Sequence, residues 1–286
     1  MKWGRYYEVR IKTPDGYLIT IKPPITFVME VSRDMRAAVN NASLTIYNLA
    51  PETRNKIYKD LYTFTLRWQI SIVAGYGNTD LYELFRGNIE EAYSLKQGTD
   101  WITTIKAYDG SYQIHNGFAN ETIEAGNTTK DMIKRVIHTM PEMLTGVLGA
   151  PAATDDASKR GTVVVGPSYD VVQGLTNKQA FIDGETLYVM GEDEVIKGDA
   201  FILDSDLNFT TPKRRDTYLE LDTLFSPEIR IGHTAEVHSL EKRYDGQYKV
   251  FGIKHSATFS EAIKGDAITT VSLNVAERSF KEVINE

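Results

Sequence analysis

Segments in which apolar and polar residues alternate make up both ends of this 286-residue chain. Side chains at every second position of a strand share one face, so the pattern predicts half-buried antiparallel strands. Hairpin turns are predicted at Asp15-Gly16 and around Gln97-Gly98. Strands are predicted at 7–12, 17–21, 25–31, 42–47, 70–74, 81–93 and 101–108, and again at 218–221, 234–240, 247–259 and 267–275. One short helix is predicted from Pro51 to Leu61.

The middle of the chain combines helices with strands. Thr128 and Asp131 have the spacing of a capping box, which predicts a helix that begins there and stops at Pro141. The other predicted elements are a helix capped by Ser168 and reaching Leu175, a hairpin over 181–189 that turns at Asp183-Gly184, a strand over 200–203 and a mobile loop over 146–160. These patterns are typical of a small α+β domain.

Three domains are therefore expected. An all-β domain covers 1–110, an α+β domain covers 111–212, and a second all-β domain covers 213–286. The last domain is expected to finish in a helical or frayed tail over 277–284.

The two all-β parts resemble each other weakly. The segments 100–105 and 266–271 match at one constant offset along the chain. At that same offset, Phe85 meets Phe251 and Tyr93 meets Phe259. Strands share Ile, Thr and aromatic residues by composition alone, which explains such a match equally well. The other explanation is that the chain holds two copies of one β-module with an insertion between them.

Charge and composition exclude several classes of function. The net charge is −7, from 39 acidic and 32 basic residues, which argues against a protein that grips phosphate backbones. The absence of Cys excludes disulfides, thiolate metal sites and a Cys nucleophile. The first residues lack the apolar core of a signal peptide, and no stretch approaches the roughly 18 apolar residues of a membrane span. We expect a soluble protein made in a cytoplasm.

The motifs expected of an enzyme or a metal protein are incomplete. The stretch 161–168 has the glycine spacing of a phosphate loop but lacks its Lys. The stretch 204–209 begins like a calcium loop, but Phe209 stands where the turn needs Gly. His233 and His238 lie five residues apart, which places them on opposite faces of a strand. We predict no catalytic residue, no cofactor and no metal, and a scaffold is favoured over an enzyme.

Several segments resemble, in the same order, the baseplate hub (tail hub) proteins of tailed bacteriophages, also known as the late control protein family. Residues 43–57, Ser-Leu-Thr-Ile-Tyr-Asn-Leu-Ala-Pro-Glu-Thr-Arg-Asn-Lys-Ile, resemble that family's strand, Asn-Leu and short helix. The other similar segments are 72–77 with Ala-Gly-Tyr, 84–89 with Phe-Arg-Gly-Asn-Ile, 100–110 ending in Asp-Gly, 181–189, 224–232 and 246–255.

The resemblance implies a mainly β fold with a small α+β insert, in which two tube-like β-barrel modules flank a middle domain. It also implies a homotrimer, whose three pairs of modules form a pseudo-sixfold ring. Such a hub adapts the hexameric tail tube, directly or through a distal tail adaptor protein, to a trimeric spike. DNA passes through the lumen, and the tape-measure protein ends in or near it. The implied location is the virion baseplate, after assembly in the host cytoplasm without membrane insertion.

Open strand edges of each module are the expected contact sites between subunits. The seams are expected at 70–76 and 81–93 in the first module and at 248–259 in the second, with helix 51–61 at a module boundary. The candidate contact residues are Ile70, Ile72, Tyr76, Phe85, Ile89, Tyr93, Tyr248, Val250 and Phe259. The net negative charge predicts an acidic lumen, which would repel DNA phosphates.

Three alternatives stay open. A spike-hub component of a contractile secretion or tailocin system shares the barrel plan, but such proteins continue into a long β-helical spike, whereas this sequence ends at Glu286. An extracellular carbohydrate-binding or wall-degrading protein would need a cleft with paired carboxylates or an aromatic platform. The third alternative is a two-barrel protein with an unrelated role.

Overall fold

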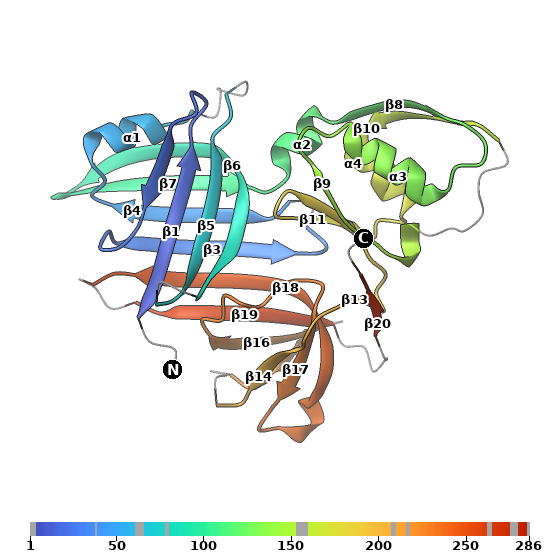
Figure 1. Cartoon of the computed structure of the whole chain (residues 1–286). Helices are drawn as coiled ribbons and strands as arrows, with labels where there is room; N and C mark the ends of the chain where they lie inside the picture. The colour runs from blue at the N-terminus through green and yellow to red at the C-terminus, as the bar shows by residue number, and fades with distance from the viewer. Residues whose placement is uncertain are drawn as a thin grey trace.

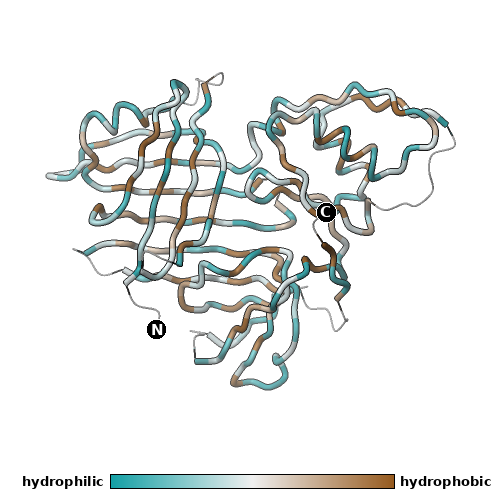
Figure 2. The backbone as a smooth tube through the Cα atoms, viewed as in Figure 1, coloured by the Kyte–Doolittle hydropathy of each residue, from teal (hydrophilic) through white to brown (hydrophobic). Residues whose placement is uncertain are grey.

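The computed structural model describes residues 4–37, 39–60, 66–77, 80–152, 160–206, 210–215, 218–261, 265–274 and 280–284. Strands dominate, as the sequence predicts, and they alternate in hydropathy along their length (Figure 2). The first part of the chain, up to Tyr108, is called the first module here, and the strand-rich last part is called the second module. The first module contains β1 (Arg5–Lys12), β2 (Leu18–Ile21), β3 (Phe27–Asp34), β4 (Asn41–Tyr47), α1 (Pro51–Ile57), β5 (Gln69–Tyr76), β6 (Asp80–Gln97) and β7 (Asp100–Tyr108).

The middle part of the chain carries most of the helical residues. Its elements are α2 (Ser111–Asn116), β8 (Phe118–Ile123), α3 (Thr129–His138), β9 (Leu144–Leu148), η1 (Ala150–Ala152), β10 (Thr162–Pro167), α4 (Ser168–Leu175), β11 (Ala180–Asp183), β12 (Thr186–Val189), β13 (Glu194–Ile196) and β14 (Phe201–Asp204). The last part is strand-rich again. Its elements are β15 (Lys213–Arg215), β16 (Tyr218–Leu224), β17 (Thr234–His238), η2 (Lys242–Tyr244), β18 (Gly246–Phe259), β19 (Ala267–Asn274) and β20 (Lys281–Val283).

One large sheet runs through both β-rich parts. Its strand order is β15-β16-β19-β18-β3-β4-β7-β6-β5-β1-β2, with β17 beside β18 and β14 beside β17. The join between the two parts is the antiparallel pair β3–β18, which runs in register from Phe27–Phe259 to Asp34–Gly252. The first and last parts of the chain are therefore held together by main-chain hydrogen bonds (Figure 1).

A four-strand arrangement occurs twice in this sheet. In the first part the order is β4-β7-β6-β5, and in the last part it is β16-β19-β18-β17. In chain order, the first strand of each set (β4 or β16) pairs with the fourth (β7 or β19). The fourth strand pairs with the third (β6 or β18). The residue-level match does not follow this repeat, because Trp101 pairs with Lys96, five residues earlier, whereas Ala267 pairs with Ala257, ten residues earlier. The two parts share strand order rather than one constant sequence offset.

The first hydrophobic core lies between strands that cross each other. β1 and β5 pass in front of β3, β4 and β7 (Figure 1), and the buried side chains of both layers form one cluster. Tyr7 stacks on Phe27 with ring centroids 4.6 Å apart. Phe225 and Phe259 belong to this cluster as well, although they come from the last part of the chain. Two further clusters fill the insert and the second β-rich part.

Local signals in the sequence located several elements correctly. The capping box of α3 is present in full, since Thr128 Oγ1 accepts from Asp131 N and the Asp131 carboxylate accepts from Thr128 N. The hairpin β6–β7 turns at Gly98 and the hairpin β11–β12 at Gly184, both with positive φ.

Other local predictions were wrong. The stretch 146–160 is not only a loop, because 144–148 forms β9 by parallel pairing with the distant β12; residues 153–159 lie outside the described residues. Ser168 is the first residue of α4 rather than its cap, and its hydroxyl meets that of Thr139 at 2.6 Å. In the expected tail over 277–284, residues 281–283 form β20 against β13, and 277–279 lie outside the described residues.

Helix α1 is also shorter than predicted. It ends at Ile57, because Lys59 exchanges two main-chain hydrogen bonds with Ala92 of β6 and so leaves the helical path. Leu61 lies outside the described residues. None of the helices in the described part of the chain combines the length and apolarity that crossing a bilayer requires.

Candidate functional site

Most of the predicted contact residues lie inside the protein. Ile70, Ile72, Phe85, Ile89, Val250 and Phe259 are all buried in the cores of this chain, none more than 4% exposed. The remaining three, Tyr76, Tyr93 and Tyr248, are half-buried. The Tyr76 hydroxyl donates to the Phe225 carbonyl at 2.8 Å, and the Tyr248 hydroxyl donates to the Tyr244 carbonyl at 3.0 Å. Tyr93 pairs with Thr104 on the outward face of β6.

The strands predicted as seams have neighbours on both sides. β5 lies between β1 and β6, and β6 lies between β5 and β7. β18 pairs with β19 on one side and with β3 and β17 on the other. In the described part of the large sheet, the strands with an unoccupied side are β2, β14 and β15 at its ends. Alternation in the sequence identifies the buried face of a strand, but the strand's position in the sheet depends on distant pairings.

The outward face of the large sheet is mostly polar near the β3–β18 join and crosses both modules. We define this sheet face by two rows of directly paired residues. The rows are Leu224, Ile268, Ser256, Glu30, Ser43, Lys106 and Glu91, and Asp222, Thr270, Lys254, Ser32, Asn41 and Tyr108. Lys254 pairs with Glu30 at 3.0 Å, and Lys106 pairs with Glu91 at 2.9 Å. The sheet face therefore presents hydroxyl and amide groups with nearly balanced charge.

A buried polar junction connects the insert to the first module. The Asp109 carboxylate, at the end of β7, accepts hydrogen bonds from the main-chain N–H groups of Gly184 and Glu185 at 2.7 and 2.8 Å. Asn40 donates to the Ile182 carbonyl at 2.9 Å. Arg67, just before β5, pairs with the Glu185 carboxylate at 2.9 Å. Side chains of the first module thus hold the turn of the β11–β12 hairpin by hydrogen bonds and an ion pair.

Two carboxylates at this junction lie in a poorly solvated environment. Burial, and then the nearby Asp183 carboxylate, raises the pKa of Asp109 to about 7, although the two N–H groups favour its charged form. Burial also raises the pKa of Asp183, against the opposite effect of the Arg33 guanidinium, which lies 3.4 Å from it. The junction therefore holds a proton more firmly than isolated aspartates would.

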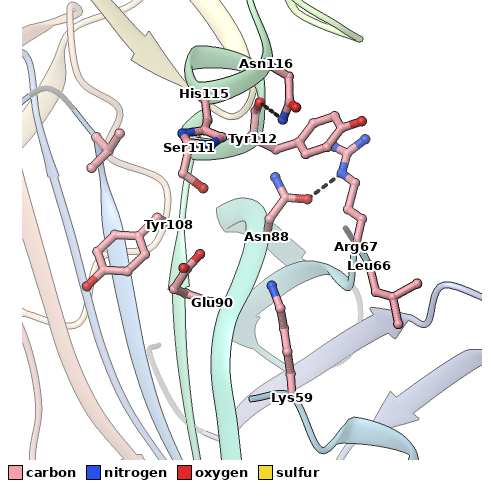
Figure 3. A pocket seen from close by; sticks show the side chains of 11 residues that line it. Lys59, Leu66, Arg67, Asn88, Glu90, Tyr108, Ser111, Tyr112, His115 and Asn116 are labelled. Atoms are coloured by element: carbon pink, nitrogen blue, oxygen red, sulfur yellow. Dashed lines mark hydrogen bonds between the residues drawn. The ribbon is translucent and has the colours of Figure 1, made fainter. Parts of the chain in front are cut away.

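A cavity of about 410 Å³ lies where the first module meets α2 (Figure 3). Several of its polar side chains have hydrogen-bond partners within the chain. Lys59 Nζ donates to the Ile89 carbonyl, Arg67 Nε donates to Asn88 Oδ1, and Asn116 Nδ2 donates to the Tyr112 carbonyl. These three side chains hold neighbouring parts of the chain together. No group of His, Cys, Asp and Glu suited to a metal ion occurs among the residues that the structure describes.

Comparison with known proteins relates the chain to phage tails. The model of the family described as baseplate hub gp41 matches residues 7–258. No curated protein matches the sequence. A tail protein from Neisseria meningitidis MC58 is similar in structure with a TM-score of 0.63 and 11% identity, over 95% of this chain and 97% of that chain. The 43 kDa tail protein of prophage MuSo2 from Shewanella oneidensis gives a TM-score of 0.59 and 8% identity, over 93% and 97%.

A protein from a secretion apparatus has a similar fold. A component of the type VI secretion system from E. coli, described as structurally similar to the T4 bacteriophage tail proteins gp27 and gp5, gives a TM-score of 0.58. It is 9% identical, over 91% of this chain and 76% of that chain. At these identities the structural likeness shows a common fold only. The assignment of the chain to a family rests on the family model.

Proposed function

This chain belongs to the baseplate hub gp41 family, and from that membership we propose that three copies form the ring-shaped hub of a phage tail. Membership makes the protein a structural component of the tail baseplate and not an enzyme. In our proposal the ring joins a hexameric tail tube, directly or through an adaptor, to a trimeric spike. It lies in the virion after assembly in the host cytoplasm, the tape-measure protein ends near its lumen, and DNA passes through it.

The observation that carries the proposal is the repeated strand order. The arrangement β4-β7-β6-β5 recurs as β16-β19-β18-β17, so each chain offers two similar surfaces. Three such chains offer six, which allows a threefold object to match a sixfold tube. We propose the division 1–110, 111–212 and 213–286, with two tube-like barrel modules around the insert. The pairing of β14 with β17 makes β14 a strand of the second module as well.

We propose that the sheet face lines the channel of the ring. It is the surface that continues across both modules through the β3–β18 join. Its hydroxyl groups and its paired charges, Lys254–Glu30 and Lys106–Glu91, offer little net attraction to phosphate. The sheet face holds three carboxylates, Glu30, Glu91 and Asp222, against two lysines, so we propose a lining that is only slightly acidic.

The contact surfaces are proposed from edges and half-buried residues. Because β5, β6 and β18 are paired on both sides, main-chain seams between subunits fit the end strands β2, β14 and β15 better. Among the nine residues predicted as contacts, we retain Tyr93. It lies beside Thr104 on the same side of β6 as Glu91, in line with the sheet face, so we propose it as a contact to the tail tube and not as part of a seam between subunits.

The likeness to the E. coli secretion component favours one second candidate, a spike hub of a secretion apparatus. The family match to baseplate hubs favours the phage tail over it.

Mass measurement in solution tests the ring. We expect three copies of the chain per complex when the trimeric spike protein of the same phage is added, whether or not the chain trimerises alone. A complex with one or two copies per spike trimer would overturn the proposal.

Lysine substitutions test the channel within an assembled ring. Ser43→Lys, Ser256→Lys and Thr270→Lys together should leave the copy number unchanged but make the ring retain double-stranded DNA at low salt. The matched control carries Asn120→Lys, Thr122→Lys and Thr162→Lys on the exposed β8–β10 ribbon of the insert. Equal retention by both variants would show that the sheet face is not the channel lining.

A further inference from the structure

A groove on the insert is bordered by the end strands of two different sheets. It has a volume of about 620 Å³ and lies among α3, β9 and β20. β9 is the last strand of the sheet β11-β12-β9, and β20 pairs with β13. In the part of the chain that the structure describes, no strand pairs with the other side of either one.

Both borders have the properties of a template for an added strand. The outer side of an end strand presents main-chain N–H and C=O groups that another extended segment can pair with. Exposed apolar side chains flank the groove, since Leu144 at the start of β9 is 54% exposed and Ile284 after β20 is 65% exposed. The groove is therefore large enough to receive a short extended segment, with exposed apolar side chains available at Leu144 and Ile284.

Two lysines give one wall of the groove positive charge. Lys130, Lys134 and His138 line it from α3, at intervals of four residues, while the apolar residues of α3 face the core of the insert. The facing acidic group, Glu282, lies 3.9 Å from Lys197, which is not among the residues that line the groove. A helix rises about 6 Å over four residues. Alternate residues of a strand lie about 6.7 Å apart, so acidic side chains at every second position of a strand match this spacing.

We propose that this groove binds an extended acidic segment of a partner protein, which adds as a strand along β9 and directs alternate carboxylates toward α3. Main-chain pairing along β9 supplies a hydrogen-bonding pattern that a protein strand matches and a nucleic acid does not. The interaction surface lies on the insert, away from the sheet face, and it does not depend on ring formation.

Synthetic peptides test this occupant. The probe is a fluorescein-labelled nine-residue peptide that alternates Glu and Val, titrated into the full chain by anisotropy. The control peptide has the same composition with its Glu residues contiguous. We expect the alternating peptide to bind at least about tenfold more tightly than the control peptide.

Variants identify the groove as the site. Lys134→Glu should weaken binding of the alternating peptide at least about tenfold. Lys12→Glu, which reverses an exposed lysine on β1, should leave binding unchanged. Hydrogen exchange should show added protection of β9 amides when the peptide is bound, a readout that charge attraction alone would not produce.

Three outcomes would overturn the proposal. They are absence of binding by the alternating peptide, equal binding by both peptides, and equal affinity in the Lys134→Glu variant. A short double-stranded DNA that bound through α3 while the peptide did not would assign the groove to nucleic acid instead. If a second copy of the chain occupied the groove instead, the chain would form a dimer. The Lys134→Glu variant would then fail to dimerise, and the alternating peptide would not compete with the dimer.

Discussion

At the scale of single residues, the predicted contact set divides into core and surface. Phe259 is 4% exposed, and its ring centroid lies 5.3 Å from that of Tyr7 and 5.8 Å from that of Phe225. Phe259→Ala should therefore lower the free energy of unfolding by about 3–5 kcal/mol. Tyr93→Ala should cost below about 1.5 kcal/mol, because its side chain is half-buried on the outward face. Urea unfolding measures both, and a cost for Tyr93→Ala equal to that of Phe259→Ala would contradict this division.

The protonation of Asp109 leads to a prediction about pH. Its pKa is raised from 3.8 to about 7, so between these values the folded protein holds a proton that the unfolded chain has released. Stability falls with rising pH wherever the folded state binds more protons, so this carboxyl should lower the free energy of unfolding progressively from about pH 4 to 7. Asp183→Asn removes the second raised carboxyl and the repulsion, so the loss across this window should become smaller.

Urea unfolding at several pH values measures that slope. The matched control is Asp170→Asn, on the exposed side of α4, which should keep the wild-type slope. An Asp183→Asn slope equal to that of the wild type would mean that the two carboxyls do not interact as the geometry indicates. The slope is the informative quantity, because Asp183→Asn also removes the ion pair with Arg33 and so lowers stability at every pH.

At the scale of elements, the capping box of α3 gives the next prediction. Thr128 Oγ1 accepts from the Asp131 main chain at 3.2 Å, which satisfies one N–H that the first helical turn leaves without an intrahelical partner. Thr128→Ala should therefore lower the free energy of unfolding by about 1 kcal/mol, whereas Thr128→Ser, which keeps the acceptor, should cost little. Thermal unfolding by circular dichroism measures both. Equal losses in the two variants would indicate that packing of the methyl group matters and not the cap.

Elements whose signals are local were the ones that sequence could predict. Thr128 with Asp131, and the glycines at 98 and 184, act within a few residues of themselves, and the structure has the helix and turns where they predict. β9 and β20 were missed because each is a strand only through a partner far along the chain. The candidate contact residues stay a prediction, and most of them are buried in this chain, which alternation could not reveal. Alternation shows that Ile70 and Val250 lie on the apolar face of a strand. Whether both sides of that strand are paired depends on the strand order of the whole sheet.

At the scale of the whole molecule, the continuous sheet joins the two modules, so we expect them to unfold as one cooperative unit. Ser256 lies in the middle of β18, where it pairs with Glu30 of β3 and with Ile268 of β19. Proline there removes a ladder hydrogen bond from a central strand and leaves a main-chain group without its partner, which should cost about 1–3 kcal/mol. Because Phe225 and Phe259 complete the core beneath β1 and β5, we expect the loss to reach the first module as well as the second.

Hydrogen exchange of the native protein distinguishes this coupling from independent modules. In Ser256→Pro, the amides of β1 and β5 should lose protection together with those of β19, while the amides of α3, in the separate core of the insert, should lose less. Ser256→Thr keeps the N–H and a hydroxyl and should preserve the wild-type pattern. Full protection of β1 and β5 in the proline variant would mean that the modules unfold separately. A ring built from such chains would then have a flexible join at β3–β18, and a channel lining that spans both modules would lose its structural basis.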